Sequence, residues 1–340
     1  MAKQIVDDFT PVTYDPQYIL MVNNLKKYFP IKAGAISHTV GYVKAVDGVT
    51  FNLKRGQTMG LVGESGCGKT TTGRTILRLY KEQKTGGQVL FNGEEVYDMD
   101  RKKLRQMRTK MQIIFQDPFS SLSPRLPVGE IIGEGVKEHN LVPKDEYEDY
   151  LETIMEECGL PAYYKPRYPH EFSGGQRQRI CIARALALNP EFVVCDEPVS
   201  ALDVSIQAQI INLLHDLQEK HNLTYLFISH DLSVVEYISD VVGVMYLGSL
   251  VEYGTKREIF DHPVHPYTKA LFSAIPIPDP DRKMNRIVLE GSIPSPANPP
   301  SGCKFHTRCP YATERCKTEV PKQVEIEPGH LVSCHEWQKM

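Results

Sequence analysis

The stretch Gly63-Glu64-Ser65-Gly66-Cys67-Gly68-Lys69-Thr70 decides the fold of this chain of 340 residues. It fits the pattern G-x-x-x-x-G-K-[ST] at every fixed position. Before it, Thr58–Val62 is apolar enough for a buried strand, and after it residues 71–79 are suited to a helix. A glycine-rich loop in this setting brings backbone N–H groups close to phosphate oxygens. The stretch therefore predicts a phosphate-binding loop.

The residue types of this loop also suit a nucleotide. The helix that begins here directs its positive end at the phosphates, Lys69 can reach the β- and γ-phosphates, and the Thr70 hydroxyl can hold Mg²⁺. A glycine-rich turn with a surface lysine is the alternative, but a chance match in a chain of this length is about one in a hundred. The predicted nucleotide-binding residues are Gly63, Glu64, Ser65, Gly66, Cys67, Gly68, Lys69, Thr70 and Thr71.

Bulk composition excludes several classes of protein. The chain is 41% hydrophobic and 24% charged, with a formal net charge of −3, which suits a soluble globular protein and gives no overall basic surface for nucleic acid. Met1–Thr10 lacks the apolar core of a secretory signal. The longest uncharged apolar stretch, Val241–Val251, is too short to span a bilayer. We expect a cytosolic protein, or one that reaches a membrane only through partners.

The residues before the phosphate loop predict short strands. Tyr18–Val22 and Val49–Leu53 have the composition of β-strands, and Asp47-Gly48 and Arg55-Gly56 are typical of turns. Between the two strands, Lys32–Tyr42 is rich in Gly and His and is expected to be a loop.

An exposed aromatic residue upstream of such a loop can stack on a nucleotide base. Tyr28 is the first candidate for this role and Tyr42 is the second. A tyrosine packed at a strand edge is an equally good interpretation of either residue.

Two short stretches carry polar groups at places suited to a nucleotide site. Met111–Phe115 predicts a buried strand, and Gln116 follows it at the edge of the sheet where ligands bind. Ser173-Gly174-Gly175-Gln176 opens a helix predicted to run to Leu188, so its N–H groups can accept an anion. Ser173 is suited to cap this helix. Each signal is weak when taken alone.

Two further strands end in groups suited to catalysis. Phe192–Asp196 predicts a buried strand whose last residue, Asp196, can hold Mg²⁺ through water. Glu197 comes next and can polarise an attacking water, while His230 follows the strand Thr224–Ile228 and is a candidate γ-phosphate contact. Adjacent acids more often form a solvated turn, and a lone histidine is more often structural. In a chain with a phosphate loop, we favour the catalytic interpretation.

Together these motifs resemble those of ABC-type ATPases over about residues 18–255. The matching motifs are a Walker A (Gly63 to Thr70), a Q-loop (Gln116), a signature (Ser173, Gly174, Gly175, Gln176), a Walker B with glutamate (Asp196, Glu197), a D-loop (Ser200 to Asp203) and a switch histidine (His230). Phe172 stands where leucine is commoner in the signature. The resemblance implies an α/β fold, with a P-loop NTPase (RecA-like) core, an antiparallel β subdomain and a helical insertion.

The resemblance also implies an organisation into domains. We expect an N-terminal extension at residues 1–17, an ABC ATPase domain at 18–270 and a C-terminal extension at 271–340. The helical subdomain would cover about 117–176, in keeping with the helix-like composition of residues 128–165.

A mechanism follows from the same resemblance. Two such domains pair head to tail, so that ATP lies between the Walker A of one subunit and the signature of the other. Glu197 would act as the base and His230 would contact the γ-phosphate. ATP and Mg²⁺ are the implied cofactors, with Thr70, Gln116 and Asp196 as the residues that hold the metal ion. ATP favours the closed pair only through contacts made in that state.

Finer features resemble the peptide/nickel permease branch of the family. They are Ser120–Arg125, His265–Leu271, and the long loop after Tyr28-Phe29-Pro30, which resembles that of the F-type ATPase subunit of oligopeptide or dipeptide importers. The implied partners are a D-type sister ATPase, two transmembrane permease subunits and an extracellular peptide-binding lipoprotein, with no nucleic acid. The implied location is the cytoplasmic face of the cell membrane, as a peripheral subunit.

Other functions compete with peptide import. Nickel or another small solute is the alternative cargo. A soluble ABC ATPase acting on ribosomes or DNA is disfavoured, because the chain has one cassette and no heptad array. Regulatory binding without hydrolysis is disfavoured by Glu197 and His230.

The last part of the chain combines prolines with four cysteines. The prolines predict an extended connector after Ile275; they are Pro276, Pro278, Pro280, Pro294, Pro296, Pro299 and Pro300. The cysteines Cys303, Cys309, Cys316 and Cys334 are spaced more widely than usual zinc ligands. Unpaired thiols are one interpretation, and a metal site that staples a small core is another. Resemblance to importer ATPases that carry a [4Fe–4S] cluster places iron–sulfur ahead of zinc.

Overall fold

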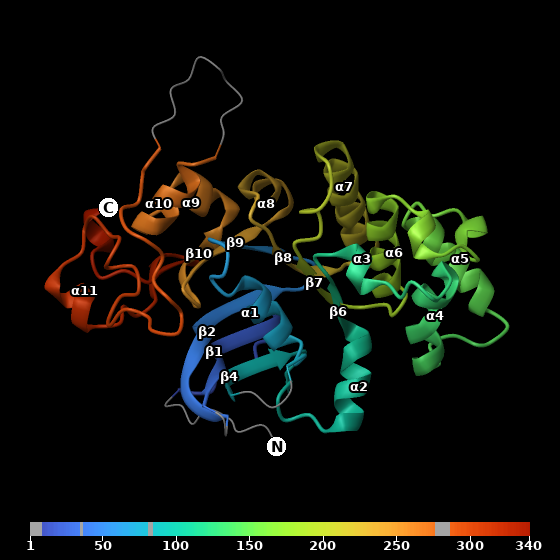
Figure 1. Ribbon diagram of the computed structural model, residues 1–340, viewed down its shortest axis with the longest axis horizontal. Helices are drawn as coiled ribbons and strands as arrows, with labels where there is room; N and C mark the ends of the chain where they lie inside the picture. The colour runs from blue at the N-terminus through green and yellow to red at the C-terminus, as the bar shows by residue number, and fades with distance from the viewer. Residues whose placement is uncertain (1–8, 35–36, 81–83, 276–285) are drawn as a thin grey trace, which may run out of the picture. The chain divides into compact units, whose positions relative to one another are not determined.

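The computed structural model of the chain describes residues 9–34, 37–80, 84–275 and 286–340. The first eight residues of the predicted N-terminal extension lie outside these ranges, as do Pro276, Pro278 and Pro280 of the predicted connector. The chain divides into two compact units. The first is formed by Met1–Lys54, Met59–Tyr97 and His230–Met340, and the second by Arg55–Thr58 and Asp98–Ser229. Figure 1 shows the course of the chain, coloured by residue number.

A four-stranded antiparallel sheet opens the first unit. Its order is β2-β1-β4-β5, with β1 at Tyr18–Ala33, β2 at His38–Lys54, β4 at Lys84–Phe91 and β5 at Glu94–Glu95. The two predicted strands pair with each other as parts of β1 and β2, and Val22 lies opposite Phe51. Both side chains are buried, as one face of an antiparallel sheet requires.

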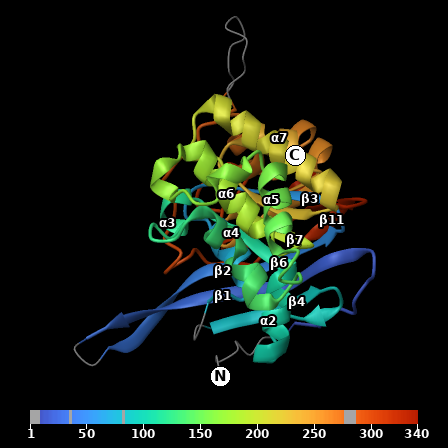
Figure 2. The ribbon, with the colours of Figure 1, turned by 90° about the vertical axis from the view of Figure 1, so that its right-hand side faces the viewer.

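The predicted loop and one predicted turn in this region are wrong. Lys32–Tyr42 was expected to be a loop, but β1 continues to Ala33 and β2 begins at His38, and together they form a long ribbon (Figure 2). Asp47-Gly48 lies inside β2 and not between strands. Gly48 has φ of +85°, and the pairing register shifts nearby, which is typical of a β-bulge. Hydrogen bonds between β1 and β2 hold these Gly-rich residues in an extended conformation. The prediction failed because the composition of one segment does not show which strand it pairs with.

The rest of the first unit surrounds a second set of strands. Strand β3 (Thr58–Val62) pairs in parallel with β9 (Val241–Tyr246), and β9 pairs antiparallel with β10 (Ser249–Thr255). Every residue of β3 and β9 is buried, which explains their unbroken apolar sequences. The helices of this unit are α1 (Lys69–Ile76), α8 (Leu232–Ile238), α9 (Lys256–Asp261) and α10 (Pro266–Phe272).

The C-terminal tail contributes strands to this unit. Residues 286–300 contain no helix or strand, in agreement with the predicted connector. They are followed by α11 (Glu314–Thr318), β11 (Val324–Glu327), β12 (His330–Val332) and the 3₁₀ helix η3 (Trp337–Lys339). Strand β12 pairs antiparallel with both β10 and β11. The tail therefore extends the sheet beyond β10, which the sequence did not predict.

The second unit combines three parallel strands with helices. Strand β7 (Phe192–Asp196) lies between β6 (Met111–Ile114) and β8 (Thr224–Ile228). Its helices are α2 (Arg101–Lys110), α3 (Pro118–Ser121), α4 (Val128–His139), α5 (Tyr147–Glu157), η1 (Ala162–Tyr164), η2 (Pro169–Glu171), α6 (Gly174–Leu186) and α7 (Val204–His221). Helix α6 packs against α3, α4, α5 and α7. The helices predicted between residues 128 and 165 are present as α4, α5 and η1.

Candidate active site

The phosphate loop joins β3 to α1 in the first unit, as predicted. Gly63 and Gly68 have φ of +148° and +109°. A Cβ on Gly63 would lie 2.2 Å from the carbonyl oxygen of Met245, and one on Gly68 would lie 2.2 Å from that of Ala45. Only glycine fits at these two positions. The two glycines of the motif are therefore required by the neighbouring backbone carbonyls as well as by the predicted phosphate binding.

Lys69 is held within the loop that precedes it. Its side chain is buried, and Nζ donates hydrogen bonds to the carbonyl oxygens of Gly63 at 2.7 Å and Glu64 at 3.1 Å. Cys67 Sγ lies 3.8 Å from the same ammonium. Burial raises the pKa of this thiol, although the charge of Lys69 opposes the shift, so Cys67 is a neutral packing residue. Thr70 and Thr71 follow in the first turn of α1.

Residues distant in sequence contact the phosphate loop. The N–H of Glu64 donates to Tyr267 Oη at 2.9 Å, and Arg308 Nη1 lies 3.0 Å from Glu64 Oε2. The N–H of Gly248 donates to the carbonyl oxygen of Cys67 at 2.8 Å. A cavity of about 280 Å³ lies between residues 64–67 and residues 293–296. Sequence reasoning missed these contacts, because Arg308 is 244 positions from Glu64.

Tyr28 is half-buried on β1, and its hydroxyl is engaged. Tyr28 Oη donates to Asp47 Oδ1, and Lys44 Nζ lies 5.8 Å from the centre of the tyrosine ring. Burial raises the pKa of Asp47, but Lys304 and the Tyr28 hydroxyl outweigh this and hold it below its usual value. Tyr42 lies on β2, opposite Pro30. Base stacking by Tyr28 or Tyr42 stays a prediction.

Gln116 and Glu197 meet in the second unit. Gln116 Nε2 donates to Glu197 Oε2 at 2.8 Å. Asp196 ends β7 and is fully buried, and the N–H of Glu197 donates to the carbonyl oxygen of Ile228 at 3.0 Å. Glu197 has φ of +48°, a conformation uncommon for residues other than glycine and typical of functional sites. The carboxylate predicted to be the base is therefore oriented by a hydrogen bond from the predicted Q-loop residue.

The Ser-Gly-Gly-Gln stretch caps α6 as the sequence predicts. Ser173 Oγ accepts a hydrogen bond from the N–H of Gln176 at 3.3 Å, and Gln176 Oε1 accepts one from the N–H of Ser173 at 3.0 Å. This reciprocal capping box fixes the start of the helix. A Cβ on Gly175 would lie 2.5 Å from Ile206 Cγ2, so the second glycine lets α6 approach α7.

His230 follows β8 in the chain and belongs to the first unit. Its side chain is exposed. The next residue, Asp231, caps α8 by accepting hydrogen bonds from the N–H groups of Ser233 at 3.0 Å and Val234 at 3.3 Å. This cap fixes the backbone at Asp231, the residue that follows His230.

The four tail cysteines are unpaired thiols that lie near one another. Cys316 is buried, and the N–H of Cys303 donates to its carbonyl oxygen at 2.8 Å. Burial, with a smaller contribution from the charges of other cysteines in the set, raises the pKa values of Cys303, Cys309 and Cys334 to about 11. In the described part of the chain, no three His, Cys, Asp or Glu side chains are arranged to hold a metal ion.

Comparison with known proteins places the chain in a family. The family model described as "ABC transporter" matches residues 46–200, and that described as "Oligopeptide/dipeptide transporter, C-terminal region" matches residues 251–316. The oligopeptide transport ATP-binding protein AppF of Bacillus subtilis (strain 168) is 56% identical over 320 residues, which cover 93% of this chain and 97% of that protein. The chain belongs to the ATP-binding proteins of oligopeptide/dipeptide ABC transporters. A putative peptide import ATP-binding protein of Brucella ovis is 52% identical over 316 residues, with the same coverage.

Solved structures agree with this family. A subunit of an ABC transporter complex from Clostridium perfringens has a TM-score of 0.61 and 27% identity, and the match covers 72% of this chain and 92% of that one. A dimeric ATP-binding cassette bound to ADP and Pi has the same TM-score and identity over 70% of this chain and 99% of that one. The predicted α/β fold of an ABC ATPase is confirmed. Among the described residues, no helix is long and apolar enough to cross a bilayer.

Proposed function

We propose that this ABC ATPase hydrolyses ATP to drive the import of oligopeptides or dipeptides. The observation that carries the proposal is the extent of similarity to the Bacillus protein, which covers 93% of the chain and so includes most of the C-terminal extension. A family description specific to oligopeptide/dipeptide transporters matches part of that extension. Nickel or another small solute is the alternative cargo, because the proposed permease subunits and binding protein would select the transported molecule.

The roles proposed for individual residues follow from the family motifs to which they belong. Gly63 to Thr71 would bind the phosphates, with the Lys69 ammonium already directed at the loop. Thr70, Gln116 and Asp196 offer hydroxyl, amide and carboxylate oxygens, which are the ligands that Mg²⁺ prefers; when bound, the ion neutralises charge on the phosphates. Glu197 would accept a proton from the attacking water. The hydrogen bond from Gln116 would hold the Glu197 carboxylate in place. His230 would contact the γ-phosphate and Tyr28 the base.

The proposed partners complete the transporter. We infer that this chain is the F-type subunit, paired with a D-type sister ATPase, two permease subunits and an extracellular peptide-binding lipoprotein at the cytoplasmic face of the membrane. Ser173 to Gln176 would then act on the ATP held by the sister subunit, since head-to-tail pairing makes each site depend on both chains. We also propose the domain boundaries 18–270 and 271–340.

The experiment compares peptide uptake in cells that carry the complete transporter with either the wild-type chain or Glu197→Gln. The substitution removes the base but keeps the size of the side chain, so uptake and phosphate release should fall to background while MgATP binding persists. Glu219→Gln, on an exposed position of α7, is the matched control and should leave uptake unchanged. Near-normal turnover in Glu197→Gln refutes the assigned base. Uptake of nickel instead of peptide by the wild-type system refutes the cargo.

We further propose that the four tail cysteines hold a [4Fe–4S] cluster, with zinc as the alternative. Four thiols that lie near one another provide the ligand set of such a cluster. The described residues contain no group of three or more His, Cys, Asp or Glu side chains arranged to hold a metal ion, so the proposal rests on the resemblance to importer ATPases. When bound, the cluster would supply a covalent cross-link among tail segments.

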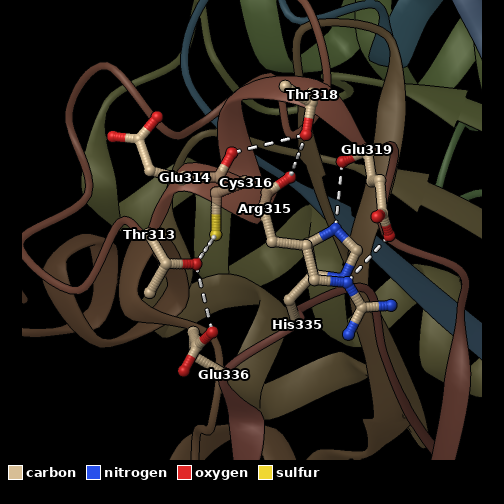
Figure 3. Close-up of polar contacts among 8 residues, drawn as sticks. All are labelled: Thr313, Glu314, Arg315, Cys316, Thr318, Glu319, His335 and Glu336. Atoms are coloured by element: carbon tan, nitrogen blue, oxygen red, sulfur yellow. Dashed lines mark hydrogen bonds and ion pairs between the residues drawn. The ribbon is translucent and has the colours of Figure 1, made fainter.

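Cys316 belongs to a short chain of hydrogen bonds. Its sulfur lies 3.4 Å from Thr313 Oγ1, and that hydroxyl donates to Glu336 Oε1 at 3.2 Å (Figure 3). With the hydroxyl proton used in this way, the contact at Cys316 is a hydrogen bond from the neutral thiol to Thr313 Oγ1, and metal binding would have to break it.

A further inference from the structure

Two basic side chains connect the cysteine-bearing tail to the phosphate loop. They are Lys304 and Arg308, which lie between Cys303 and Cys309 and are called here the tail clamp. We propose that the tail clamp positions the phosphate loop for nucleotide binding, so that the C-terminal extension controls the affinity of the ATP site. The inference rests on the proposed assignment of Gly63 to Thr71 as that site.

Arg308 contacts the loop directly. Its Nη1 lies 3.0 Å from Glu64 Oε2 and 3.3 Å from Glu64 Oε1, and its Nη2 lies 3.3 Å from Glu64 Oε1. The arginine side chain is only 8% exposed. A guanidinium that engages both oxygens of a carboxylate fixes its orientation as well as its position. Arg308 thereby restrains the second residue of the loop.

Tyr267 holds the backbone of the same residue. The N–H of Glu64 donates to Tyr267 Oη at 2.9 Å. Glu64 is therefore restrained through both its side chain and its main chain, by α10 and by the tail. With the start of the loop restrained in this way, less ordering entropy has to be lost when phosphate binds.

Lys304 acts on the loop through the turn at residues 247–249. Its Nζ lies 2.9 Å from the carbonyl oxygen of Leu247, 2.7 Å from Ser249 Oγ and 2.9 Å from Asp47 Oδ2. The N–H of Gly248, at the centre of this turn, donates to the carbonyl oxygen of Cys67 at 2.8 Å. Leu247 has φ of +42°, which is unfavourable for leucine. Lys304 thus stabilises a strained turn that binds the second half of the loop.

Phe305 makes the tail clamp rigid. Its side chain is buried, and its ring centre lies 5.2 Å from that of Tyr246 and 5.6 Å from that of Tyr267. The N–H of Arg308 donates to the carbonyl oxygen of Phe305 at 3.0 Å. Lys304 and Arg308 therefore extend from a turn that is fixed in the core of the first unit, and they can transmit its position to the loop.

A purely structural role within the tail is the competing explanation. The tail contains an ion pair of that kind, in which Arg315 Nε lies 2.8 Å from Glu319 Oε2 (Figure 3). Both residues of this pair are exposed and belong to the tail. Arg315→Ala is therefore the matched control for Arg308→Ala, because each variant removes one arginine–glutamate pair but only one pair includes the loop.

The test measures MgATP binding to the full-length chain by titration calorimetry, together with the melting temperature of each variant. We expect Arg308→Ala to weaken binding about tenfold, as the loss of a charged hydrogen-bonded pair implies. Arg308→Lys should bind MgATP more tightly than Arg308→Ala but less tightly than the wild type. Lysine keeps the positive charge but lacks the paired N–H groups with which a guanidinium binds both carboxylate oxygens. Lys304→Met should also weaken binding, and Arg315→Ala should leave it unchanged.

A double-mutant cycle tests whether the pair acts as a unit. Glu64→Ala combined with Arg308→Ala should bind MgATP no more weakly than the weaker single variant. Unchanged affinity in Arg308→Ala, with only a lower melting temperature, overturns the inference and leaves the proposed ATP site standing. A wild-type chain that does not bind MgATP overturns the proposed site itself. If Arg308→Ala does not fold, wild-type affinity in Arg308→Lys overturns the inference instead.

Discussion

Backbone conformations available to few residue types define the site at the scale of single residues. Gly68 caps α1 with φ of +109°, and its Cα faces the carbonyl oxygen of Ala45 at a distance that leaves no room for a methyl group. Glu197 adopts φ of +48° without being glycine. Glycine adopts a positive φ at Gly68 without strain. Glu197 adopts one at a cost in backbone strain, which is typical of positions where a side chain must take one orientation.

Gly68→Ala should abolish MgATP binding and lower the free energy of unfolding by about 1–3 kcal/mol, the cost of one strained residue. The added Cβ would lie 2.2 Å from the carbonyl oxygen of Ala45, so the loop has to move. Urea unfolding and calorimetric titration measure the two effects. The control is Gly41→Ala, where the new Cβ would meet Ile31 at an ordinary 3.7 Å. Wild-type affinity in Gly68→Ala contradicts the argument that close approach selects this glycine.

At the scale of elements, one buried carboxylate joins three parts of the first unit. Glu252 on β10 accepts hydrogen bonds from the N–H groups of Val264 at 2.7 Å and His265 at 2.9 Å. Its Oε1 also lies 2.9 Å from His330 Nε2 on β12. His265 in turn caps α10, since its Nδ1 accepts a hydrogen bond from the N–H of Tyr267 at 3.1 Å. The same tyrosine contacts the phosphate loop, so this network supports the site.

This network predicts a dependence of stability on pH. Burial lowers the pKa of His265 to about 4, although the charge of Glu252 opposes the shift, whereas an unfolded histidine titrates near 6.5. Between these values the unfolded chain binds more protons than the folded chain, so the free energy of unfolding falls as the pH falls from about 6.5 to about 4. His265→Asn keeps a capping acceptor but does not titrate, and it should reduce this fall.

Urea unfolding of both proteins at several pH values across that window measures the difference. Burial lowers the pKa of His330, but Glu252, Glu258 and Glu327 together raise it above its usual value. This histidine therefore adds stability at low pH that is lost as the pH rises. Because His330 shares Glu252 with His265, the same measurement on His330→Asn and on the double variant separates the two contributions. Equal pH slopes for the two proteins are the outcome that contradicts the assignment.

At the scale of the whole molecule, the proposed metal site would stabilise the C-terminal tail. Its short elements α11, β11 and β12 bury few large side chains, and a small core of this kind gains most from a cross-link. The four cysteines span residues 303–334 and so would join the turn that carries Lys304 and Arg308 to α11 and to the end of β12. Because metal binding contributes to folding free energy, occupancy of these cysteines would also stabilise the tail clamp.

Protein purified without oxygen should contain about four iron and four sulfide per chain, with absorption in the visible range. Removal of the iron by a chelator should lower the melting temperature. Cys316→Ser, which keeps the hydrogen bond to Thr313, should lose the iron. Lys317→Ala, next to it on α11, is the control and should retain it. Colourless, zinc-loaded protein rules out the cluster and favours the alternative metal.

Local motifs allowed the sequence alone to determine the family. The motifs that were predicted depend on residues close to one another in sequence. They are the phosphate loop Gly63 to Thr70, the capping box at Ser173 and Gln176, and the strands before Asp196 and His230. The strands Thr58–Val62, Phe192–Asp196 and Thr224–Ile228 were predicted because complete burial demands unbroken apolar sequence.

Only the tertiary structure decided what holds the phosphate loop in place. The pair of Glu64 and Arg308 has no local signature, and a chain with 39 basic and 42 acidic side chains allows too many such pairs for the sequence to choose among them. The ribbon of β1 and β2 and the attachment of β12 to β10 were missed for the same reason, since backbone pairing depends on a partner strand and hardly on residue type. The phosphate loop is thus specified locally, while its support comes from a tail more than 200 residues away.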